Sequence, residues 1–86
     1  MPGPMTLELL AALEVIEDDV MAVVNAYMAD PGCGSIVFGE RYRIDPASAL
    51  AEHPFASTLM RQPWVTDDLR LAAVRAAVML AQPERA

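Results

Sequence analysis

Hydrophobic and polar positions alternate with the period of an α-helix through the first third of the chain. No proline or glycine interrupts this pattern between Leu7 and Ala29, and the sequence Asp30-Pro31-Gly32 ends it. At about 100° per residue, one face collects the apolar side chains Leu9, Leu13, Ile16, Val20, Val23 and Tyr27. The pattern predicts one long amphipathic helix over residues 5–29, with Thr6 as its N-cap and this face in the core.

A second apolar stripe lies beside this face and exceeds what one small core needs. It comprises Leu10, Met21, Val24 and Met28. The chain has 86 residues, which we place in one domain, 1–86. A domain of this size buries only about 60–65% of the surface of its unfolded chain. Because a second copy would cover the surplus stripe, these four residues are predicted to form a homodimer interface.

A strand pattern occurs over residues 35–44. Gly39-Glu40 fits a two-residue turn with glycine where a positive φ is needed, and this turn would join two short strands into a β-hairpin. The face expected to be cationic and aromatic comprises Ile36, Phe38, Arg41 and Arg43. The face expected to meet the core comprises Val37, Tyr42 and Ile44.

Residues 46–82 have the pattern of a helical segment. Asp45 followed by Pro46 is an N-cap with proline at the first helical position, and His53-Pro54 ends or restarts this short helix. A second short helix is expected over about residues 55–62, and Thr66 caps a final helix that reaches about Gln82. Two apolar stripes of the final helix are expected to be covered: Leu69, Ala72, Ala73, Ala76 and Leu80 form one, and Leu71, Val74 and Val78 form the other.

These elements predict a fold that is mainly α with a short β-hairpin. A long N-terminal helix is followed by the hairpin, two short helices and a C-terminal helix.

Charge is distributed unevenly along the chain. The net charge is −6, the chain has no lysine, and residues 1–40 hold seven acidic residues and no arginine. All six arginines lie in residues 41–86. Glu14 and Asp18 are four residues apart on one predicted helical face, where like charges repel. The asymmetry indicates an acidic N-terminal surface suited to a basic partner.

The residues do not combine into a recognisable catalytic or metal site. Cys33 lies between glycines and His53 is the only histidine, but a nucleophilic pair also needs a third, orienting group. The four acids of residues 14–19 do not have the alternating spacing of a calcium loop. The sequence also has neither a phosphate-cradling glycine loop nor the Cys/His spacing of a zinc site. We therefore predict a non-enzymatic protein without cofactor or metal.

The cytoplasm is the expected location. The single cysteine excludes an internal disulfide. The chain does not open with a basic segment followed by an apolar run, as a signal peptide does. Its longest uncharged apolar stretch, Val20 to Ala29, is about half of the roughly 20 residues that a membrane span needs. No contact with a membrane is expected.

Several short motifs follow one another between residues 30 and 81. They are Asp30-Pro31, then "GSIVFGERYRI", then "ALAEHPFASTLMRQPWVTDD" and an alanine-rich helix. This order resembles a family of small bacterial antitoxin-like proteins, catalogued as a domain of unknown function, many of which are encoded beside PIN-like toxins. Gly39 and Arg41 fall on the Gly-Thr-Arg motif of that family, where Glu40 replaces the threonine. Pro63 and Thr66 fall on the turn before its last homeodomain-like helix.

These patterns predict a protein–protein interaction module of the antitoxin type, which neutralises a basic partner through its acidic helix. The residues predicted to bind the partner are Glu14, Glu17, Asp18, Arg41 and Arg43. Acidic surfaces steer onto the cationic surfaces of proteins that handle nucleic acid.

Two alternatives stay open. One is a phage or mobile-element inhibitor, anti-CRISPR-like, that mimics nucleic acid against a host defence complex. The other is a small dimeric transcriptional regulator. The net charge of −6 and the lack of lysine oppose direct DNA binding by a single copy, because that binding depends on many basic contacts to phosphates.

Overall fold

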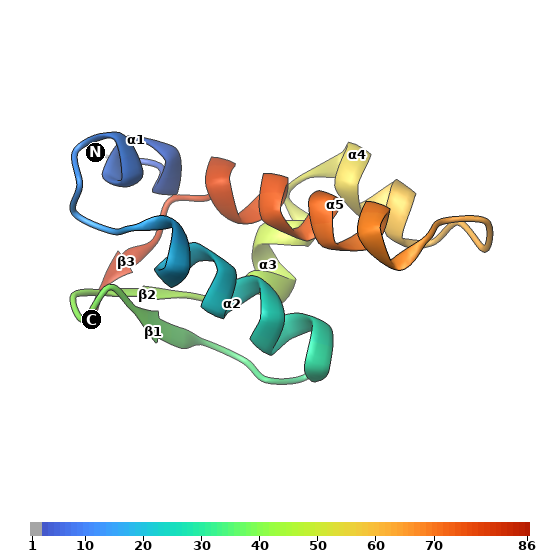
Figure 1. Ribbon diagram of the computed structural model, residues 1–86, viewed down its shortest axis with the longest axis horizontal. Helices are drawn as coiled ribbons and strands as arrows, with labels where there is room; N and C mark the ends of the chain where they lie inside the picture. Colours follow the sequence, from blue (N-terminus) through green and yellow to red (C-terminus); the bar gives the residue numbers. More distant parts are fainter. Residues whose placement is uncertain (1–2) are drawn as a thin grey trace.

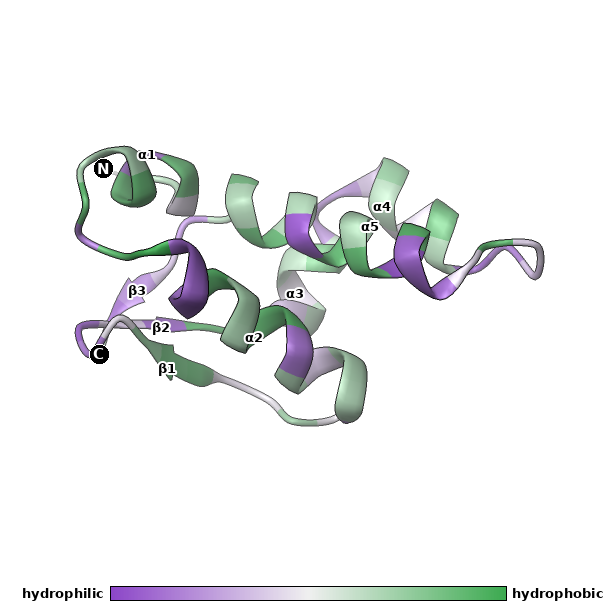
Figure 2. Cartoon of the chain, in the orientation of Figure 1, coloured by the Kyte–Doolittle hydropathy of each residue, from purple (hydrophilic) through white to green (hydrophobic). Residues whose placement is uncertain are grey.

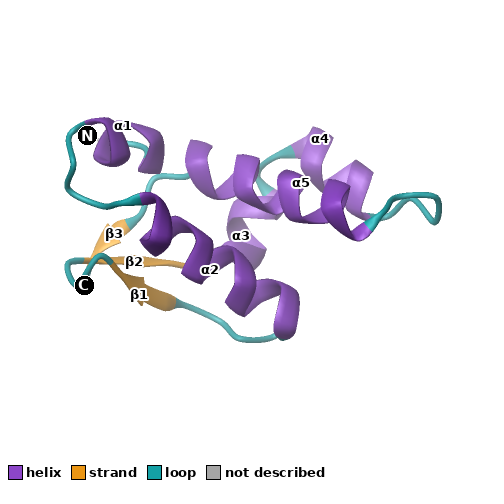
Figure 3. Ribbon diagram, viewed as in Figure 1, coloured by secondary structure: helices purple, strands orange, loops and turns teal. Residues whose placement is uncertain are grey.

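The computed structural model describes residues 3–86, which form helices and a small β-sheet (Figures 1 and 3). The helices are α1 (Thr6–Ala11), α2 (Glu17–Ala29), α3 (Pro46–Ala51), α4 (Pro54–Met60) and α5 (Asp67–Leu80). The strands are β1 (Ile36–Phe38), β2 (Tyr42–Ile44) and β3 (Glu84–Arg85). The predicted class, mainly α with a short β-hairpin, is confirmed, although the N-terminal helix and the hairpin differ in detail. Residues 1 and 2 of the predicted domain lie outside the described residues.

The predicted long N-terminal helix is two helices, because α1 ends in a Schellman motif. Leu13 has a φ of 61°, in the left-handed region. Its amide donates to the carbonyl of Leu10 at 3.1 Å. The next amide, that of Glu14, donates to the carbonyl of Leu9 at 2.9 Å. Glycine usually occupies the left-handed position of this motif. Since leucine occupies it here, the sequence pattern hid the break, and the prediction of one helix is wrong.

This break changes which side chains enter the core. The buried members of the predicted face are Leu9, Val20 and Val23, and Tyr27 packs against them while partly exposed. Leu13 and Ile16 were predicted to be core, but they are 80% and 52% exposed. Val15, which lies outside the predicted face, is only 1% exposed. In the segment between the two helices, Val15 is therefore buried, whereas Leu13 and Ile16 are exposed.

The N-termini of α1 and α2 are not capped by Thr6, as the sequence predicted, but are held by other hydrogen bonds. The Asp19 carboxylate accepts the amide of Ile16 at 3.0 Å and so starts α2 after the break. Thr6 is not the N-cap of α1, because it is the first helical residue and is fully buried. Its amide donates to the carbonyl of Ala81 at 2.9 Å. This bond fastens α1 to the chain that follows α5.

The later helices begin as predicted. Asp45 and Thr66 cap α3 and α5, and each side chain accepts a hydrogen bond from an amide in the first turn. His53 caps α4, because its Nδ1 atom accepts the amide of Ala56 at 3.1 Å. Helix α5 ends at Leu80, slightly before the predicted end.

Helix α5 is the centre of the fold. The other four helices pack against it, and α2 also packs against β1 (Figure 1). The valines that α2 and α5 bring to the core have no exposed surface, and they are Val20, Val23, Val24, Val74 and Val78. Valine side chains are stiff because they branch at Cβ, so they interlock in few arrangements. This contact fixes how the two longest helices lie relative to each other.

The hairpin forms, but its register is shifted by one residue from the prediction. The pairs are Ile36 with Ile44, Val37 with Arg43, and Phe38 with Tyr42. Three residues therefore make the turn instead of two, and paired residues share a face. Phe38 and Tyr42 lie together on the buried face with Ile44, whereas Val37 is on the outer face with Arg43. The prediction holds for β2, where Tyr42 and Ile44 are buried and Arg43 is exposed, but it is wrong for β1, where Phe38 is buried and Val37 is exposed.

A third strand, which the sequence pattern did not predict, completes the sheet. Strand β3 pairs antiparallel with β2, so that Glu84 lies opposite Arg43 and Arg85 opposite Tyr42. The amide of Ala86 also donates to the carbonyl of Arg41 at 2.9 Å. A two-residue strand is too short to show an alternating pattern.

The stripe predicted to form a dimer interface is largely covered within the chain. Val24 is fully buried. Leu10, Met21 and Met28 are partly buried and pack against the core. These residues therefore do not form the surplus apolar surface that the sequence pattern indicated.

A substitution at Gly39 tests how closely the β1–β2 turn approaches Val15 in the loop between α1 and α2. Gly39 has a φ of 58°, and a Cβ atom added there would lie 2.7 Å from Cγ1 of the buried Val15. We expect Gly39→Ala to lower the free energy of unfolding by about 2–4 kcal/mol, because left-handed strain adds to overpacking. Chemical denaturation measures this loss.

Gly34→Ala is the matched control. Gly34 has a φ of 73°, but nothing lies within 4 Å of an added Cβ. This variant should lose only the backbone contribution, about 1 kcal/mol. Equal losses of stability in the two variants would show that overpacking against Val15 contributes nothing to the loss at Gly39.

Candidate partner-binding surface

The acids predicted to bind a partner gather where α2 begins. The first turn of α2 holds Glu17, Asp18 and Asp19, and Glu14 precedes them in the loop from α1. Figure 2 shows the hydrophilic start of α2 directly after a loop that is hydrophobic at most of its positions. We define the acidic elbow as the exposed surface formed by Leu13, Glu14, Ile16, Glu17 and Asp18.

Two acids of the acidic elbow form ion pairs with arginines from later in the chain. Glu14 Oε2 lies 3.5 Å from Arg41 Nη1, and Glu17 Oε1 lies 2.7 Å from Arg75 Nη2. The sequence shows no basic residue near these acids, and the fold supplies one to each. The four side chains remain 39% to 68% exposed, so solvent screens both pairs. Pairs of this kind contribute about 0–1 kcal/mol each.

The acids beside these pairs differ in role. Asp19 is used by the fold, because its carboxylate accepts the amide of Ile16. Asp18 is exposed, and Glu40 is exposed in the β1–β2 turn, close to the start of α2. Within residues 3–86, no ion pair involves either Asp18 or Glu40. The surface at this end of α2 therefore keeps unbalanced negative charge after the arginines are counted.

Two large apolar side chains project beside these acids. Leu13 is 80% exposed and Ile16 is 52% exposed. The left-handed conformation of Leu13 costs about 1–2 kcal/mol for a residue other than glycine, and an exposed side chain recovers little of this by packing. Strain that persists at an exposed residue is typical of positions under a functional constraint. The sequence pattern missed both residues as site residues because it placed them in the core.

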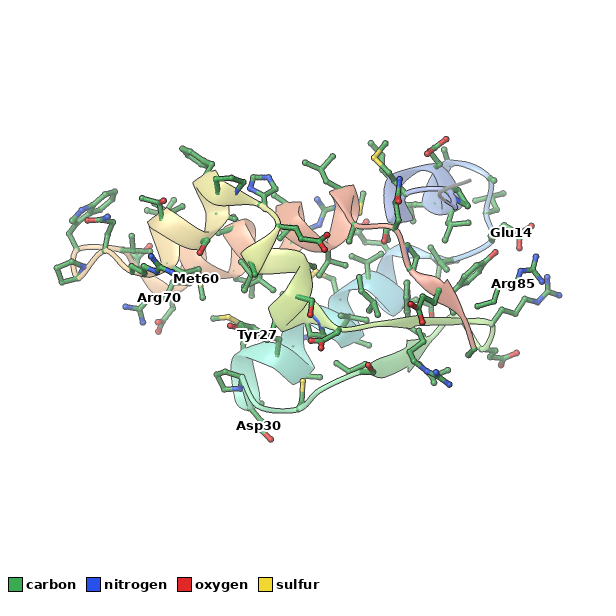
Figure 4. All side chains as sticks on the ribbon, turned by 180° about the vertical axis from the view of Figure 1, so that it is seen from behind. Glu14, Tyr27, Asp30, Met60, Arg70 and Arg85 are labelled. Atoms are coloured by element: carbon green, nitrogen blue, oxygen red, sulfur yellow. The ribbon has the colours of Figure 1, made fainter. Side chains whose placement is uncertain are left out.

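The two arginines predicted to bind a partner lie on different surfaces. Arg41 is in the β1–β2 turn and pairs with Glu14. Arg43 is on the outer face of β2, opposite Glu84 of β3. The shift in hairpin register separates them, because only one of the two is now in a strand. Figure 4 shows that Glu14 lies at the same end of the molecule as Arg85. Arg41 thus borders the acidic elbow, and Arg43 belongs to the sheet surface.

The remaining candidates for chemistry have roles in local structure. Within residues 3–86, no group of three or more His, Cys, Asp or Glu side chains is placed to hold a metal ion. The Nδ1 atom of His53 accepts the amide of Ala56. Cys33 is partly buried in the loop before β1, where its Sγ atom lies 3.7 Å from the carbonyl oxygen of Gly34.

Comparison with known proteins gives no relative for this chain: no family model, curated protein or solved structure matches it. In the described part of the chain, no helix is long and apolar enough to cross a membrane. Function is therefore inferred from the surfaces of the chain itself.

Leu13→Gly distinguishes the contribution of the strained backbone to stability from that of the leucine side chain. Glycine adopts a φ of 61° without steric conflict, and the exposed leucine contributes little packing. We expect this variant to raise the free energy of unfolding by about 0.5–1 kcal/mol, or a few degrees in melting temperature. Leu13→Ala keeps the strain and should not raise it. Equal stability of the two variants would mean that the strain at this φ is no larger than the extra conformational entropy that glycine loses on folding.

A double-mutant cycle with Glu17→Gln and Arg75→Gln measures how far the fold depends on the shorter ion pair. We expect a coupling energy of about 0.5 kcal/mol that vanishes in about 1 M salt, because both groups are exposed. Thermal denaturation of the four proteins provides the values. A coupling energy above about 2 kcal/mol would show that the pair is part of the structural core.

Proposed function

We propose that this protein is a non-enzymatic, cytoplasmic interaction module of the antitoxin type, which binds a basic protein partner through the acidic elbow. Leu13 is the most exposed large apolar residue of this surface. Glu14, Glu17 and Asp18 follow it in the chain and supply negative charge, and Arg41 borders the surface through its ion pair with Glu14. The partner presents a cationic surface of the kind that handles nucleic acid.

The exposed, left-handed Leu13 carries this proposal. Its backbone conformation costs free energy in the isolated protein, and its side chain gains nothing from the protein's own core. A partner that buries the leucine side chain offsets this cost. Burying a leucine side chain contributes roughly 1.5–3 kcal/mol, which is as large as the strain or larger.

The charges around Leu13 support a basic partner. A central apolar residue with a polar rim is the usual anatomy of a protein interface, and rim charges mainly set the association rate and the choice of partner. The acidic elbow holds three acids, and the net charge of the chain is −6. Because the two arginine pairs are open to solvent, an incoming basic group can exchange with them at little cost.

Affinity capture from a lysate of the source organism tests the proposal. The immobilised protein should retain a basic protein at low ionic strength, and retention should fall steeply as salt rises, because exposed charges are screened. Leu13→Ala and Asp18→Asn should each reduce retention of that protein, about tenfold for the leucine. Mass spectrometry identifies the captured chain. A growth-arresting toxin assigns the antitoxin role, and a nucleic-acid-binding defence complex assigns the inhibitor role.

Two control variants lie outside the acidic elbow. Val37→Ala removes an aliphatic side chain that is 55% exposed on β1. Asp30→Asn removes an exposed negative charge at the other end of α2 (Figure 4). Both should retain the partner as the wild type does. If the elbow variants and the controls capture the same proteins in the same amounts, the acidic elbow is not the binding surface.

A further inference from the structure

An apolar groove lies between α4 and α5. Figure 1 shows α4 and the start of α5 at the end of the molecule away from the sheet. The groove encloses about 340 Å³, and its principal lining residues are Phe55, Leu59, Trp64, Leu69, Ala72 and Ala76. The two aromatic side chains at its edges are 74% and 65% exposed. His53 is the only titratable residue in the lining. The protein therefore presents a largely uncharged apolar surface that residues 3–86 do not cover.

Helix α5 carries an exposed apolar stripe that lines this groove for most of its length and ends beyond it at Leu80. The stripe consists of Leu69, Ala72, Ala76 and Leu80, which are three or four residues apart and so share one helical face. All four are exposed. The adjoining residues Ala73, Val74 and Val78 are buried in the chain's own core. The sequence pattern predicted that both stripes of this helix would be covered. Within residues 3–86, the second stripe is buried at Val74 and Val78 and partly buried at Leu71, whereas only Ala73 of the first stripe is buried.

We propose that a second copy of this chain covers the groove, with the two α5 helices packed antiparallel about a two-fold axis near residue 74. The stripe has a large residue at each end and small residues between them. Read in either direction it runs Leu, Ala, Ala, Leu. In an antiparallel pair, Ala72 of one copy meets Ala76 of the other, and each Leu69 meets the other Leu80. A surface that is complementary to itself in this way is what a two-fold interface requires.

The shape of the surface supports the same arrangement. Phe55 and Trp64 project from it, while Ala72 and Ala76 form a depression beside them. Projections and depressions on one surface let two copies interdigitate, and small residues let the helix backbones approach closely. The α4–α5 hairpin of each copy then supplies two helices of a four-helix bundle.

Charge opposes a parallel arrangement of the two α5 helices. Asp67 and Asp68 lie in the first turn of α5. A parallel pair would bring the four acids of two copies together. Since α5 has 14 residues and a helix rises 1.5 Å per residue, an antiparallel pair separates them by about 20 Å. That distance is beyond the range of screened repulsion in physiological salt.

The exposed area is sufficient for a specific dimer. An aromatic side chain buries about 150–250 Å², so Phe55, Trp64 and the two leucines of the stripe expose on the order of 450 Å² per copy. With Ala72 and Ala76, two copies bury on the order of 1,000 Å² in total, which is the lower bound for a specific interface. We expect a dimer that dissociates on dilution in the micromolar range.

Light scattering coupled to size exclusion tests the proposal over about 1–300 µM loaded protein. The mass should rise from 9.3 kDa toward twice that value. Ala76→Glu places a charge in the centre of the proposed interface and should weaken dimerisation at least tenfold without loss of helicity. Ala47→Glu makes the same change at an exposed position of α3 and should dimerise as the wild type does.

Cysteine cross-linking tests the direction of packing. In a Cys33→Ser background, the double variant Ala72→Cys, Ala76→Cys should form two intermolecular disulfides under oxidation. In the antiparallel pair, the cysteine at position 72 of one copy lies opposite the cysteine at position 76 of the other. Ala72→Cys alone should cross-link poorly. Efficient cross-linking of that single variant would overturn the antiparallel register. A protein that stays at 9.3 kDa throughout, or a dimer that Ala76→Glu does not weaken, would overturn the proposal itself.

Discussion

The packing of α2 against α5 is the interaction on which the rest of the structure depends. Five valines from these helices are completely buried, and burying each contributes roughly 1.5–3 kcal/mol. The remaining helices also pack against α5, and β1 packs against the other side of α2. Because every other layer is positioned by one of these two helices, their contact sets the relative placement of the sheet, the acidic elbow and the α4–α5 groove.

Val15 links this core to the acidic elbow. Its burial under the β1–β2 turn, where Gly39 leaves room for it, requires that the chain turn between α1 and α2. The left-handed Leu13 makes this turn, and the same turn leaves Leu13 and Ile16 exposed. The strained residue therefore has a structural cause, which is the burial of its neighbour. Its leucine side chain is a separate feature, since glycine would make the same turn with less strain.

The charge asymmetry of the sequence is reduced, but not removed, by folding. Arg41 and Arg75 come from the second half of the chain and lie against Glu14 and Glu17. Asp18 keeps its charge exposed beside them. The apolar groove at α4 and α5 has almost no charged lining. A dimer formed through the groove would leave both acidic elbows open, so the two proposed contacts can be made at the same time.

The sequence by itself determined the later helices, the caps of α3 and α5 and the mainly helical class. Those features depend on local signals: Asp45 before Pro46, Thr66 before two acids, and an apolar repeat over one face. It also identified Glu14, Glu17 and Asp18 as surface acids, because charged side chains are rarely buried.

The tertiary structure alone decided the break at Leu13, the hairpin register, strand β3 and the arginine partners of the acids. Leucine is a strong helix former, so no local signal marks it as the end of a helix, and the burial of Val15 overrides its preference. The hairpin register follows from which strand residues reach the core, and the pairing of Arg75 with Glu17 joins residues 58 positions apart. Contacts at that distance depend on how α2 and α5 pack, which periodicity within a single element does not encode.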